Sequence, residues 1–351
     1  MISLYKSKIY LSDLSVAADS VVGIDKLKNK SILITGATGL IGSFIVDMLL
    51  CHNEKADANI KIYACGRSKE RLHARFAEKE SENLEFVEYD VNTPVNFDFN
   101  TDYIIHAASN AYPAAFNADP VGTINSNVIG TNNLLNFALN HGAERFLFVS
   151  SGEVYGQCND DVTAFTESYS GYVDPTDTRS CYPVSKRAAE TLCVSFTKQF
   201  GLQTVIARPC HTYGPNTTKS DNRANVQFVN NAINGEDIVM KSAGSQMRSY
   251  CYVADCASAI LTVLLCGNSG EAYNICNNNA RISIAGFAKE VAESVGKKVI
   301  FENPTDADIA QQTKISYAVL DGTKLESLGF KPNYSVNRGV NNTVKALLEV
   351  K

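Results

Sequence analysis

The feature that most constrains the fold is a set of three glycines, Gly36, Gly39 and Gly42, placed directly after a short apolar stretch. Residues 31–34 (Ser-Ile-Leu-Ile) are branched and apolar, which is typical of a buried parallel strand, and residues 40–50 predict a helix. Glycines at this spacing allow a tight turn, close approach of a pyrophosphate and close packing of the helix on the strand. The positive end of such a helix suits phosphate, so this segment is a predicted dinucleotide-binding unit.

The rest of the first 210 residues alternates short apolar runs with helical stretches. This alternation predicts the α/β class, with a doubly wound parallel sheet of the Rossmann type. After Gly214 the pattern changes to loops, short helices and isolated strands, which predicts a smaller C-terminal substrate-binding domain. The expected organisation is an N-terminal extension over 1–29, an NAD(P)-binding domain over 30–210, and a mainly substrate-binding domain over 211–351 with some segments returning to the Rossmann core.

Two long helices are predicted, at residues 120–141 and 183–200, and Tyr182 and Lys186 stand where the second begins. Residues four apart share one face of a helix, so the hydroxyl and the ammonium can converge. A nearby ammonium favours the phenolate, so the tyrosine pKa is expected to fall below about 10. Such a tyrosine can take a proton from an alcohol while hydride leaves the same carbon, which is redox chemistry on a nicotinamide.

Composition and charge exclude several classes of protein. The net charge of −5 argues against nucleic acid as a partner, and no apolar run is long enough to span a membrane. The N-terminus lacks a signal-peptide pattern, and ten cysteines without close paired spacing indicate reduced thiols in a cytoplasmic protein. The five histidines are scattered, so no metal site is expected.

Several motifs together resemble the extended short-chain dehydrogenase/reductase family, in its nucleotide-sugar epimerase and dehydratase branch. The resemblance runs from about residue 30 to about residue 340. Within the branch it is similar to UDP-glucuronate decarboxylases and also to dTDP-glucose and GDP-mannose 4,6-dehydratases. The motifs are Thr35 to Gly42, Asp90-Val91, Asn127 to Thr131, Ser150 to Gly156, Tyr172 to Pro175, Arg179 to Arg187, Arg208 to Pro215 and Gly244 to Arg248.

The resemblance implies catalytic roles for four residues. Ser151 would hydrogen-bond the 4-hydroxyl of the sugar, Tyr182 would remove its proton, and Lys186 would bind the nicotinamide ribose. Glu153 would then remove or return a proton at the fifth carbon, made acidic by the new ketone. The chain departs from the dTDP-glucose dehydratase pattern at Gly152, where those enzymes have an aspartate that protonates the leaving 6-hydroxyl.

The cofactor is expected to be NADP or NAD, tightly bound and recycled. Arg67 follows the second predicted strand, where an arginine favours the additional phosphate of NADP and an acidic residue favours NAD. Stacking of Arg67 on adenine, or its exposure to solvent, would leave NAD as the cofactor. The candidate cofactor-binding residues are Gly36, Thr38, Gly39, Leu40, Ile41, Gly42, Arg67, Asp90, Val91, Ala107, Ala108, Tyr182 and Lys186.

On the substrate side, Arg248 matches the family's diphosphate-binding arginine, because a planar bidentate donor suits two phosphate oxygens. The other candidate substrate residues are Ser109, Asn127, Arg179, His211 and Arg223. His106 is expected to be a packed strand residue rather than a catalyst. The two long helices resemble those that form a four-helix dimer interface in this family, so a homodimer is expected.

The resulting prediction is a nucleotide-sugar-converting enzyme that oxidises the fourth carbon and then acts at the fifth, as a 4,6-dehydratase or a decarboxylase. One alternative is a 4- or 5-epimerase, in which hydride returns to the opposite face. A second alternative, from another class, is a catalytically silent NAD(P)-sensing or RNA-associated protein on the same fold.

Overall fold

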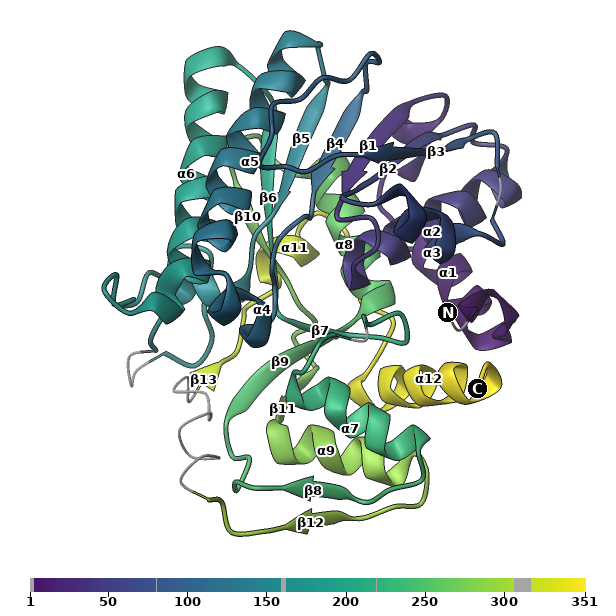
Figure 1. The fold of residues 1–351 in the computed structure, drawn as a ribbon, viewed down its shortest axis with the longest axis vertical. Coiled ribbons are helices and arrows are strands. Elements are labelled where there is room, and N and C mark those ends of the chain that lie inside the picture. Colours follow the sequence, from purple (N-terminus) through teal and green to yellow (C-terminus); the bar gives the residue numbers. More distant parts are fainter. Residues whose placement is uncertain (1–2, 80, 159–161, 219, 306–316) are drawn as a thin grey trace.

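A computed structural model describes residues 3–79, 81–158, 162–218, 220–305 and 317–351 of the chain. Its centre is a seven-stranded sheet in which every strand pairing is parallel (Figure 1). Chain order reverses between β1 and β4, which creates a crevice for ligands at the carboxyl ends of these strands. Across the sheet the strands are β10 (Ala272–Ile275), β6 (Thr204–Pro209), β5 (Arg145–Val149), β4 (Tyr103–His106), β1 (Ser31–Thr35), β2 (Lys61–Gly66) and β3 (Leu84–Glu88).

The predicted doubly wound α/β fold is therefore confirmed, with one addition. The first six strands lie where the sequence predicts them, whereas the seventh, β10, comes from the part of the chain assigned mainly to the substrate. β10 is short and lies at the edge of the sheet, where it pairs only with β6. It also comes after the region in which the sequence alternates regularly between strands and helices, so this pattern does not identify it. This strand is one of the segments expected to return to the core.

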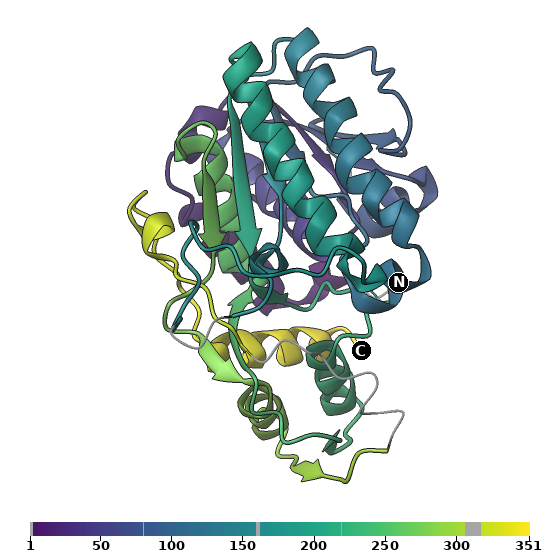
Figure 2. The same cartoon turned by 90° about the vertical axis from the view of Figure 1, so that its left-hand side faces the viewer.

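Long helices cover both faces of the sheet. The pair α5 (Pro120–Asn140) and α6 (Cys181–Phe200) runs side by side over one face (Figure 2). The helices α1 (Lys8–Asp19), α2 (Leu40–Ala56) and α8 (Val253–Cys266) pack together on the other, and α3 (Lys69–Phe76) contacts β2 and β3. α6 begins two residues before Pro183, because the first turn of a helix leaves its N–H groups unpaired and tolerates proline.

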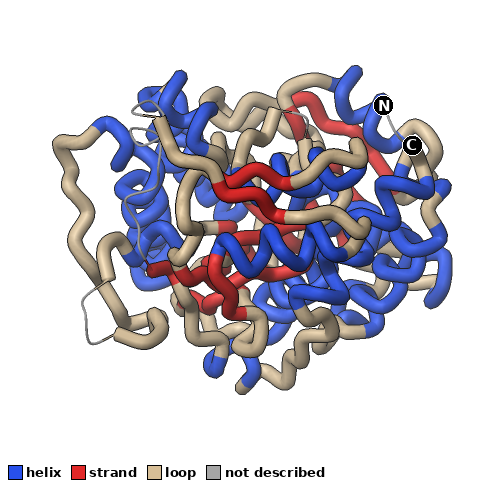
Figure 3. The backbone as a smooth tube through the Cα atoms, turned by 90° about the horizontal axis from the view of Figure 1, so that it is seen from below, coloured by secondary structure: helices blue, strands red, loops and turns tan. Residues whose placement is uncertain are grey.

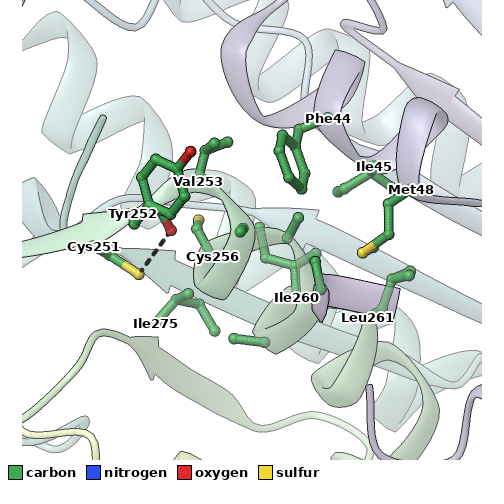
Figure 4. Close-up of a cluster of buried hydrophobic side chains, with 14 of the residues drawn as sticks. Phe44, Ile45, Met48, Cys251, Tyr252, Val253, Cys256, Ile260, Leu261 and Ile275 are labelled. Carbon is green, nitrogen blue, oxygen red and sulfur yellow. Dashed lines mark hydrogen bonds between the residues drawn. The ribbon is translucent and has the colours of Figure 1, made fainter. Parts of the chain in front are cut away.

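The interior between α2 and α8 is a close-packed apolar cluster (Figure 4). Phe44, Ile45 and Met48 of α2 meet Ile260 and Leu261 of α8, and all five side chains are fully buried. α8 has a buried residue at nearly every position, which explains its continuous apolar sequence. This packing holds the segment that begins at Gly36 firmly against the sheet.

The remaining elements form a smaller region below the main sheet in Figure 1. One sheet contains β7 (His211–Tyr213), β9 (Met247–Tyr252), β11 (Arg281–Ser283) and β13 (Tyr317–Ala318), and β8 (Ile238–Met240) pairs with β12 (Val299–Phe301). Its helices are α7 (Ala224–Ile233), α9 (Ile284–Glu293) and α12 (Val336–Glu349). Among the described residues, the short helical segments are η1 (Leu4–Lys6), η2 (Ile24–Leu27), α4 (Pro113–Ala118), η3 (Gly152–Tyr155), η4 (Thr178–Ser180) and α11 (Thr323–Glu326).

The N-terminal extension is part of the packed structure. The buried carboxylate of Asp13 on α1 accepts hydrogen bonds from the hydroxyls of Tyr252 and Tyr334, both at 2.7 Å. The two ends of the chain lie close together (Figure 3), and the Ser7 hydroxyl donates to the Glu349 carboxylate at 2.6 Å. The extension therefore connects the main sheet to the smaller region.

Candidate active site

The glycine loop between β1 and α2 has the shape that a dinucleotide needs. Gly36 has a φ of +70°, and a Cβ atom at this position would lie 2.8 Å from the carbonyl carbon and oxygen of Ala107. Gly39 caps α2 without a side-chain hydrogen bond, so the first N–H groups of a 17-residue helix point to an open position. The residues present fit a pyrophosphate, because Gly36 and Gly42 let the loop pack closely against Ala107 and against itself, and Gly39 has no side chain at the N-terminus of the helix.

The other predicted cofactor residues lie around this loop, at the carboxyl edge of the sheet. Thr38, Leu40 and Ile41 form the loop and the first turn of α2, and all three are partly exposed. Arg67 follows β2 and is exposed, whereas Val91 follows β3 and is buried against Gly130 of α5. Asp90 precedes Val91, and Ala107 and Ala108 follow β4.

His106, at the end of β4, is a packed residue as expected. Its ring is fully buried and its Nδ1 shares a 2.8 Å hydrogen bond with the Thr35 hydroxyl. Burial, together with the positive charge of Lys186, lowers the pKa of His106 to about 3. The imidazole is therefore neutral and serves the cofactor edge of the sheet as a structural group.

Tyr182 and Lys186 lie on one face of α6, beneath the end of β5. The Lys186 amine donates to the Val149 carbonyl at 2.8 Å and lies 5.7 Å from the centre of the Tyr182 ring. Ser151 follows β5 at the start of η3, where its hydroxyl accepts from the Glu153 N–H at 3.2 Å, and its side chain is close enough to Tyr182 to lower the pKa of the tyrosine. The structure thus brings together the three residues that the sequence places 31 and 4 positions apart.

The prediction that Lys186 lowers the pKa of Tyr182 is wrong. Burial raises the pKa of Tyr182 to about 12, and the negative charge of Glu153 adds to the rise, while Ser151 and the charges of Arg223 and Arg179 oppose it. Burial also lowers the pKa of Lys186 to about 7, partly offset by Glu190. The spacing in the sequence could not show this, because the cost of removing both groups from water exceeds the benefit of their proximity.

Glu153 lies beside the tyrosine in η3 and is held by Arg179. The Arg179 guanidinium donates to a Glu153 carboxylate oxygen at 3.0 Å. The guanidinium also lies over the Phe116 ring, 4.4 Å from its centre, and Phe116 stacks on Tyr182 with ring centres 5.3 Å apart. Phe116, in α4, is therefore a site residue that the sequence analysis missed, since no motif marks it.

Asn127 supports the site from behind. Its side chain is fully buried in α5 and donates to the Ser185 hydroxyl of α6 at 2.9 Å. Ser185 in turn donates to the Cys181 carbonyl at 2.5 Å. This places Asn127 as a contact between the two long helices, and the structure adds nothing to its predicted contact with substrate.

The predicted substrate residues of the smaller region converge on the same place. Arg248 of β9 is almost fully buried and donates to the Met247 carbonyl, while Arg223 at the start of α7 forms a bidentate pair with Asp221. The positive charges of these two arginines, added to its burial, lower the pKa of His211 to about 3. Ser109 follows the cofactor edge of the sheet, and its hydroxyl is buried without a hydrogen-bond partner among the described residues.

Two further groups that the sequence analysis did not single out hold this arrangement. Glu190, one turn after Lys186 on α6, accepts from Arg208 at 2.6 and 2.9 Å and from the Ser150 hydroxyl at 2.5 Å. Asn216 donates to the Leu40 carbonyl at 2.6 Å and to the Ser43 hydroxyl at 2.9 Å, which joins the smaller region to the glycine loop. Both residues stand within or next to motifs recognised in the sequence, and this position was the only sign that they belong to the site.

Across the described ranges, no group of three or more His, Cys, Asp or Glu side chains is arranged to hold a metal ion. In the same part of the chain, no helix is both long enough and apolar enough to cross a membrane.

Similar proteins of known name share nearly the full length of the chain. "UDP-glucuronic acid decarboxylase 3" of Arabidopsis thaliana is 35% identical over 320 residues, which cover 89% of this chain and 87% of that protein. "UDP-glucuronic acid decarboxylase 1" of Xenopus tropicalis is 31% identical over 317 residues, covering 90% of this chain and 71% of that protein.

Solved structures share the fold at lower identity. A UDP-N-acetylglucosamine 4-epimerase from Methanobrevibacter ruminantium, in complex with UDP-N-acetylmuramic acid, superposes with a TM-score of 0.76 at 23% identity, covering 91% of this chain and 98% of that one. A dTDP-glucose 4,6-dehydratase from Streptomyces venezuelae with NAD bound gives 0.72 at 24%, covering 90% and 96%. The model of the NAD-dependent epimerase/dehydratase family matches residues 32–276, which contain the glycine loop, Ser151, Tyr182 and Lys186, and this chain belongs to that family.

Proposed function

We propose that the protein converts a nucleotide-diphosphate sugar by oxidation at its fourth carbon followed by decarboxylation at its fifth, with UDP-glucuronate as substrate. The observation that carries the proposal is the Glu153 carboxylate, held by Arg179 beside Tyr182, in a chain whose relatives are named UDP-glucuronic acid decarboxylases. A site that only exchanged hydride at the fourth carbon would not need a second ionisable group there.

The glycine loop at the N-terminus of α2 would hold the pyrophosphate of the cofactor, and Ala107, Ala108 and Lys186 would hold its nicotinamide half. When bound there, NAD supplies the acceptor and later the donor of the hydride at the fourth carbon. We take NAD as the cofactor because the family is NAD-dependent. The preference of the exposed Arg67 for NADP stays a prediction.

The first step needs a base at the sugar 4-hydroxyl, and Tyr182 is placed for it. Ser151 lies close enough to Tyr182 to lower its pKa, and it would accept or donate at the same sugar oxygen. Because the pKa of Tyr182 stands at about 12, the tyrosine must first release its own proton to solvent before it can take the proton of the 4-hydroxyl. Lys186, with its pKa lowered to about 7, can supply positive charge to the developing phenolate at little cost in reorganisation.

The second step follows from the chemistry of the ketone. A 4-ketone stands β to the carboxylate of a uronate, so the bond between the fifth and sixth carbons can break with its electron pair moving onto the ketone oxygen. Carbon dioxide leaves, Tyr182 hydrogen-bonds the enolate oxygen, and a proton then adds to the fifth carbon. Because the net reaction consumes one proton, we assign Glu153 to take that proton from solvent and deliver it to the fifth carbon.

A 4,6-dehydratase is the second candidate, since Glu153 would equally remove the proton of the fifth carbon. The preceding position favours decarboxylation. A Cβ on Gly152 would lie 3.3 Å from Leu320 and 3.4 Å from the Pro209 carbonyl, so this position is apolar and crowded and holds no acid for a leaving 6-hydroxyl. A 4-epimerase would not need Glu153, and a 5-epimerase would use it only at the fifth carbon. A cofactor-sensing protein would not need Tyr182.

The test is the mass change of a panel of nucleotide sugars, including UDP-glucuronate, UDP-glucose and dTDP-glucose, after incubation with the full chain and NAD or NADP. We expect loss of carbon dioxide from UDP-glucuronate. Loss of water would establish the dehydratase, an unchanged mass with a changed sugar would establish an epimerase, and no turnover of any sugar would contradict the proposal.

Substitution of the two key residues separates the steps. Tyr182→Phe should lower turnover by about 10²-fold to 10⁴-fold, because it removes the acid/base group. Glu153→Gln should slow product formation. When the reaction is run in deuterated water, the deuterium content of the product at its fifth carbon shows whether that carbon is still protonated. Tyr63→Phe, on β2, and Glu78→Gln, on the exposed surface after α3, are the matched controls and should keep full activity.

We also propose a homodimer and a cytoplasmic location. The dimer is supported by α5, a 21-residue surface helix without a single charged residue, on which Val121, Ile124 and Ile129 are exposed. The free state of all ten cysteines is compatible with a reducing compartment.

A further inference from the structure

Arg179 differs from the other cations around Tyr182 in how it is held. Lys186 is almost fully buried and donates to the Val149 carbonyl, and Arg248 is also almost fully buried. Arg223 is engaged by both oxygens of Asp221. The side chain of Arg179 is 37% exposed, against 26% for Arg223, and its ion-pair partner Glu153 is itself 29% exposed. Arg179 is thus the cation of this group that an incoming anion can reach most easily.

The orientation of the guanidinium is set by aromatic stacking. Arg179 lies 4.4 Å from the centre of the Phe116 ring, and Phe116 is fully buried and stacked on Tyr182 at an interplanar angle of 15°. A guanidinium stacked on a ring keeps its edges free for in-plane hydrogen bonds, and a carboxylate can occupy such an edge through both oxygens. Phe116 therefore positions the guanidinium, since the same ring also stacks on the tyrosine.

A uronate substrate brings a second carboxylate close to Glu153, so a cation such as Arg179 is needed to balance the two negative charges. The fifth carbon is bonded to the fourth, so a sugar with its 4-hydroxyl at Tyr182 would carry the substituent of its fifth carbon close to the tyrosine, where the charge of Glu153 also acts. A carboxylate there would face the carboxylate of Glu153, and like charges in a partly desolvated site disfavour binding. A cation that pairs with the incoming carboxylate offsets this penalty.

We propose that Arg179 is the receptor for the carboxylate on the fifth carbon of the substrate, and that it exchanges its ion-pair partner from Glu153 to that carboxylate when the substrate binds. This inference rests on the proposed function and specifies how a uronate is distinguished from a neutral hexose. The exchange frees Glu153 at the moment when it is needed at the fifth carbon. As the carboxylate leaves as neutral carbon dioxide, Arg179 returns to Glu153.

A kinetic signature follows from the direction of the charge movement. Pairing with Arg179 stabilises the ionised carboxylate of the bound substrate, whereas in the transition state that charge moves away towards the ketone oxygen. The interaction therefore favours the ground state at least as much as the transition state, and its removal should act mainly on KM. Arg179 is in this sense a specificity residue for uronates.

The experiment compares two ligands that differ only in the carboxylate, UDP-glucuronate and UDP-xylose. Affinities are measured by calorimetry on the full chain with NAD present, in the Tyr182→Phe background, in which turnover is slowed. Arg179→Gln should weaken UDP-glucuronate roughly tenfold or more and UDP-xylose by less than about threefold, as expected for one charge-assisted bidentate contact. Arg71→Gln, exposed on α3, is the matched control and should change neither affinity.

Two further variants test the exchange itself. Glu153→Gln should strengthen binding of UDP-glucuronate but not of UDP-xylose, because it removes the competing carboxylate. Arg179→Lys keeps the charge without the planar fork and should recover part of the lost affinity. Retained binding of UDP-xylose shows that each variant is folded.

The inference is overturned if Arg179→Gln weakens both ligands equally or neither, or if Glu153→Gln leaves the affinity for UDP-glucuronate unchanged. Failure of the proposed function has a different outcome. The chain with Tyr182 intact would then release no carbon dioxide from UDP-glucuronate, although Arg179 still governed its binding. In the converse case, carbon dioxide is released but Arg179→Gln has no effect on binding.

Discussion

At the scale of single residues, the tyrosine of the site is kept protonated until a ligand arrives. Burial and the charge of Glu153 raise the pKa of Tyr182, and Arg179 and Arg223 only partly oppose the rise. If Glu153 and Arg179 paired with other groups, the effect of each on the pKa of Tyr182 would change. The acid strength of the tyrosine is thus a property of its neighbours, and variants of Glu153 or Arg179 should shift the pH dependence of kcat.

Gly36 is the residue at which the cofactor loop depends most on the absence of a side chain. Gly36→Ala should lower the free energy of unfolding by about 2 to 4 kcal/mol, because a positive φ and the contact with Ala107 both oppose a Cβ. The same displacement of the loop should weaken NAD binding. Chemical unfolding followed by circular dichroism, together with calorimetric titration of NAD, measures the two effects.

Gly142→Ala separates backbone strain from steric contact. Gly142 has a φ of +68°, but a Cβ there meets nothing within 4 Å. Its replacement should cost about 1 kcal/mol and leave NAD binding unchanged. Equal losses of stability in the two variants, or intact NAD binding by Gly36→Ala, would refute the role assigned to the loop.

At the scale of elements, α8 and α1 hold carboxylates that connect distant parts of the chain. Asp255, in the first turn of α8, accepts from the backbone N–H groups of Asn333 and Tyr334 at 2.9 and 3.0 Å. Asp13 on α1 binds the side chain of the same Tyr334. The residues around 333 therefore attach to both helices, and the position of α12 follows from these contacts.

The burial of Asp255 makes stability depend on pH in a defined direction. Burial raises its pKa from 3.8 to about 6, despite the N–H groups and Arg338, which lower it. Between these two values the folded chain holds a proton that the unfolded chain has lost. The contribution of Asp255 to stability is therefore full below pH 3.8 and is lost as the pH rises through about 6. The total loss is about 3 kcal/mol.

Asp255→Asn should remove this dependence. The difference in unfolding free energy between the variant and the parent chain, measured by urea unfolding from pH 4 to pH 7, should move in favour of the variant by up to about 3 kcal/mol. A constant offset from the altered hydrogen bonds does not affect this slope. Asp98→Asn, at an exposed position before β4, should run parallel to the parent chain. Parallel behaviour of Asp255→Asn would show that the carboxylate titrates normally.

At the scale of the whole molecule, the exposed face of α5 and α6 accounts for the expected dimer. Ile129 of α5 and Val194 of α6 are 44% and 42% exposed on neighbouring helices. Ile129→Glu and Val194→Glu should convert a dimer to a monomer, because a charge cannot be buried unpaired in an apolar interface. Light scattering during size-exclusion chromatography gives the mass directly. Val239→Glu on β8, 41% exposed, is the control that should stay dimeric. A parent chain that elutes as a monomer would contradict the proposal.

The sequence by itself determined the elements and the motifs they contain. The buried strands, the glycine turn and the pairing of Tyr182 with Lys186 on one helix all follow from patterns shorter than about 20 residues. Periodicity, turn geometry and helix spacing are local properties, and parallel strands with short connections then have few possible arrangements. For this reason the doubly wound sheet and most of its strand positions could be predicted.

Only the tertiary structure decided how the site is charged and what surrounds it. Phe116 reaches Arg179 across more than 60 positions of sequence, and Asn216 reaches Leu40 across 176. The pKa of Tyr182 rose instead of falling because burial, which no local pattern records, outweighed the effects of Ser151, Arg223 and Arg179. Desolvation and long-range contacts depend on which surfaces meet when the chain closes, so they exist only in the folded molecule.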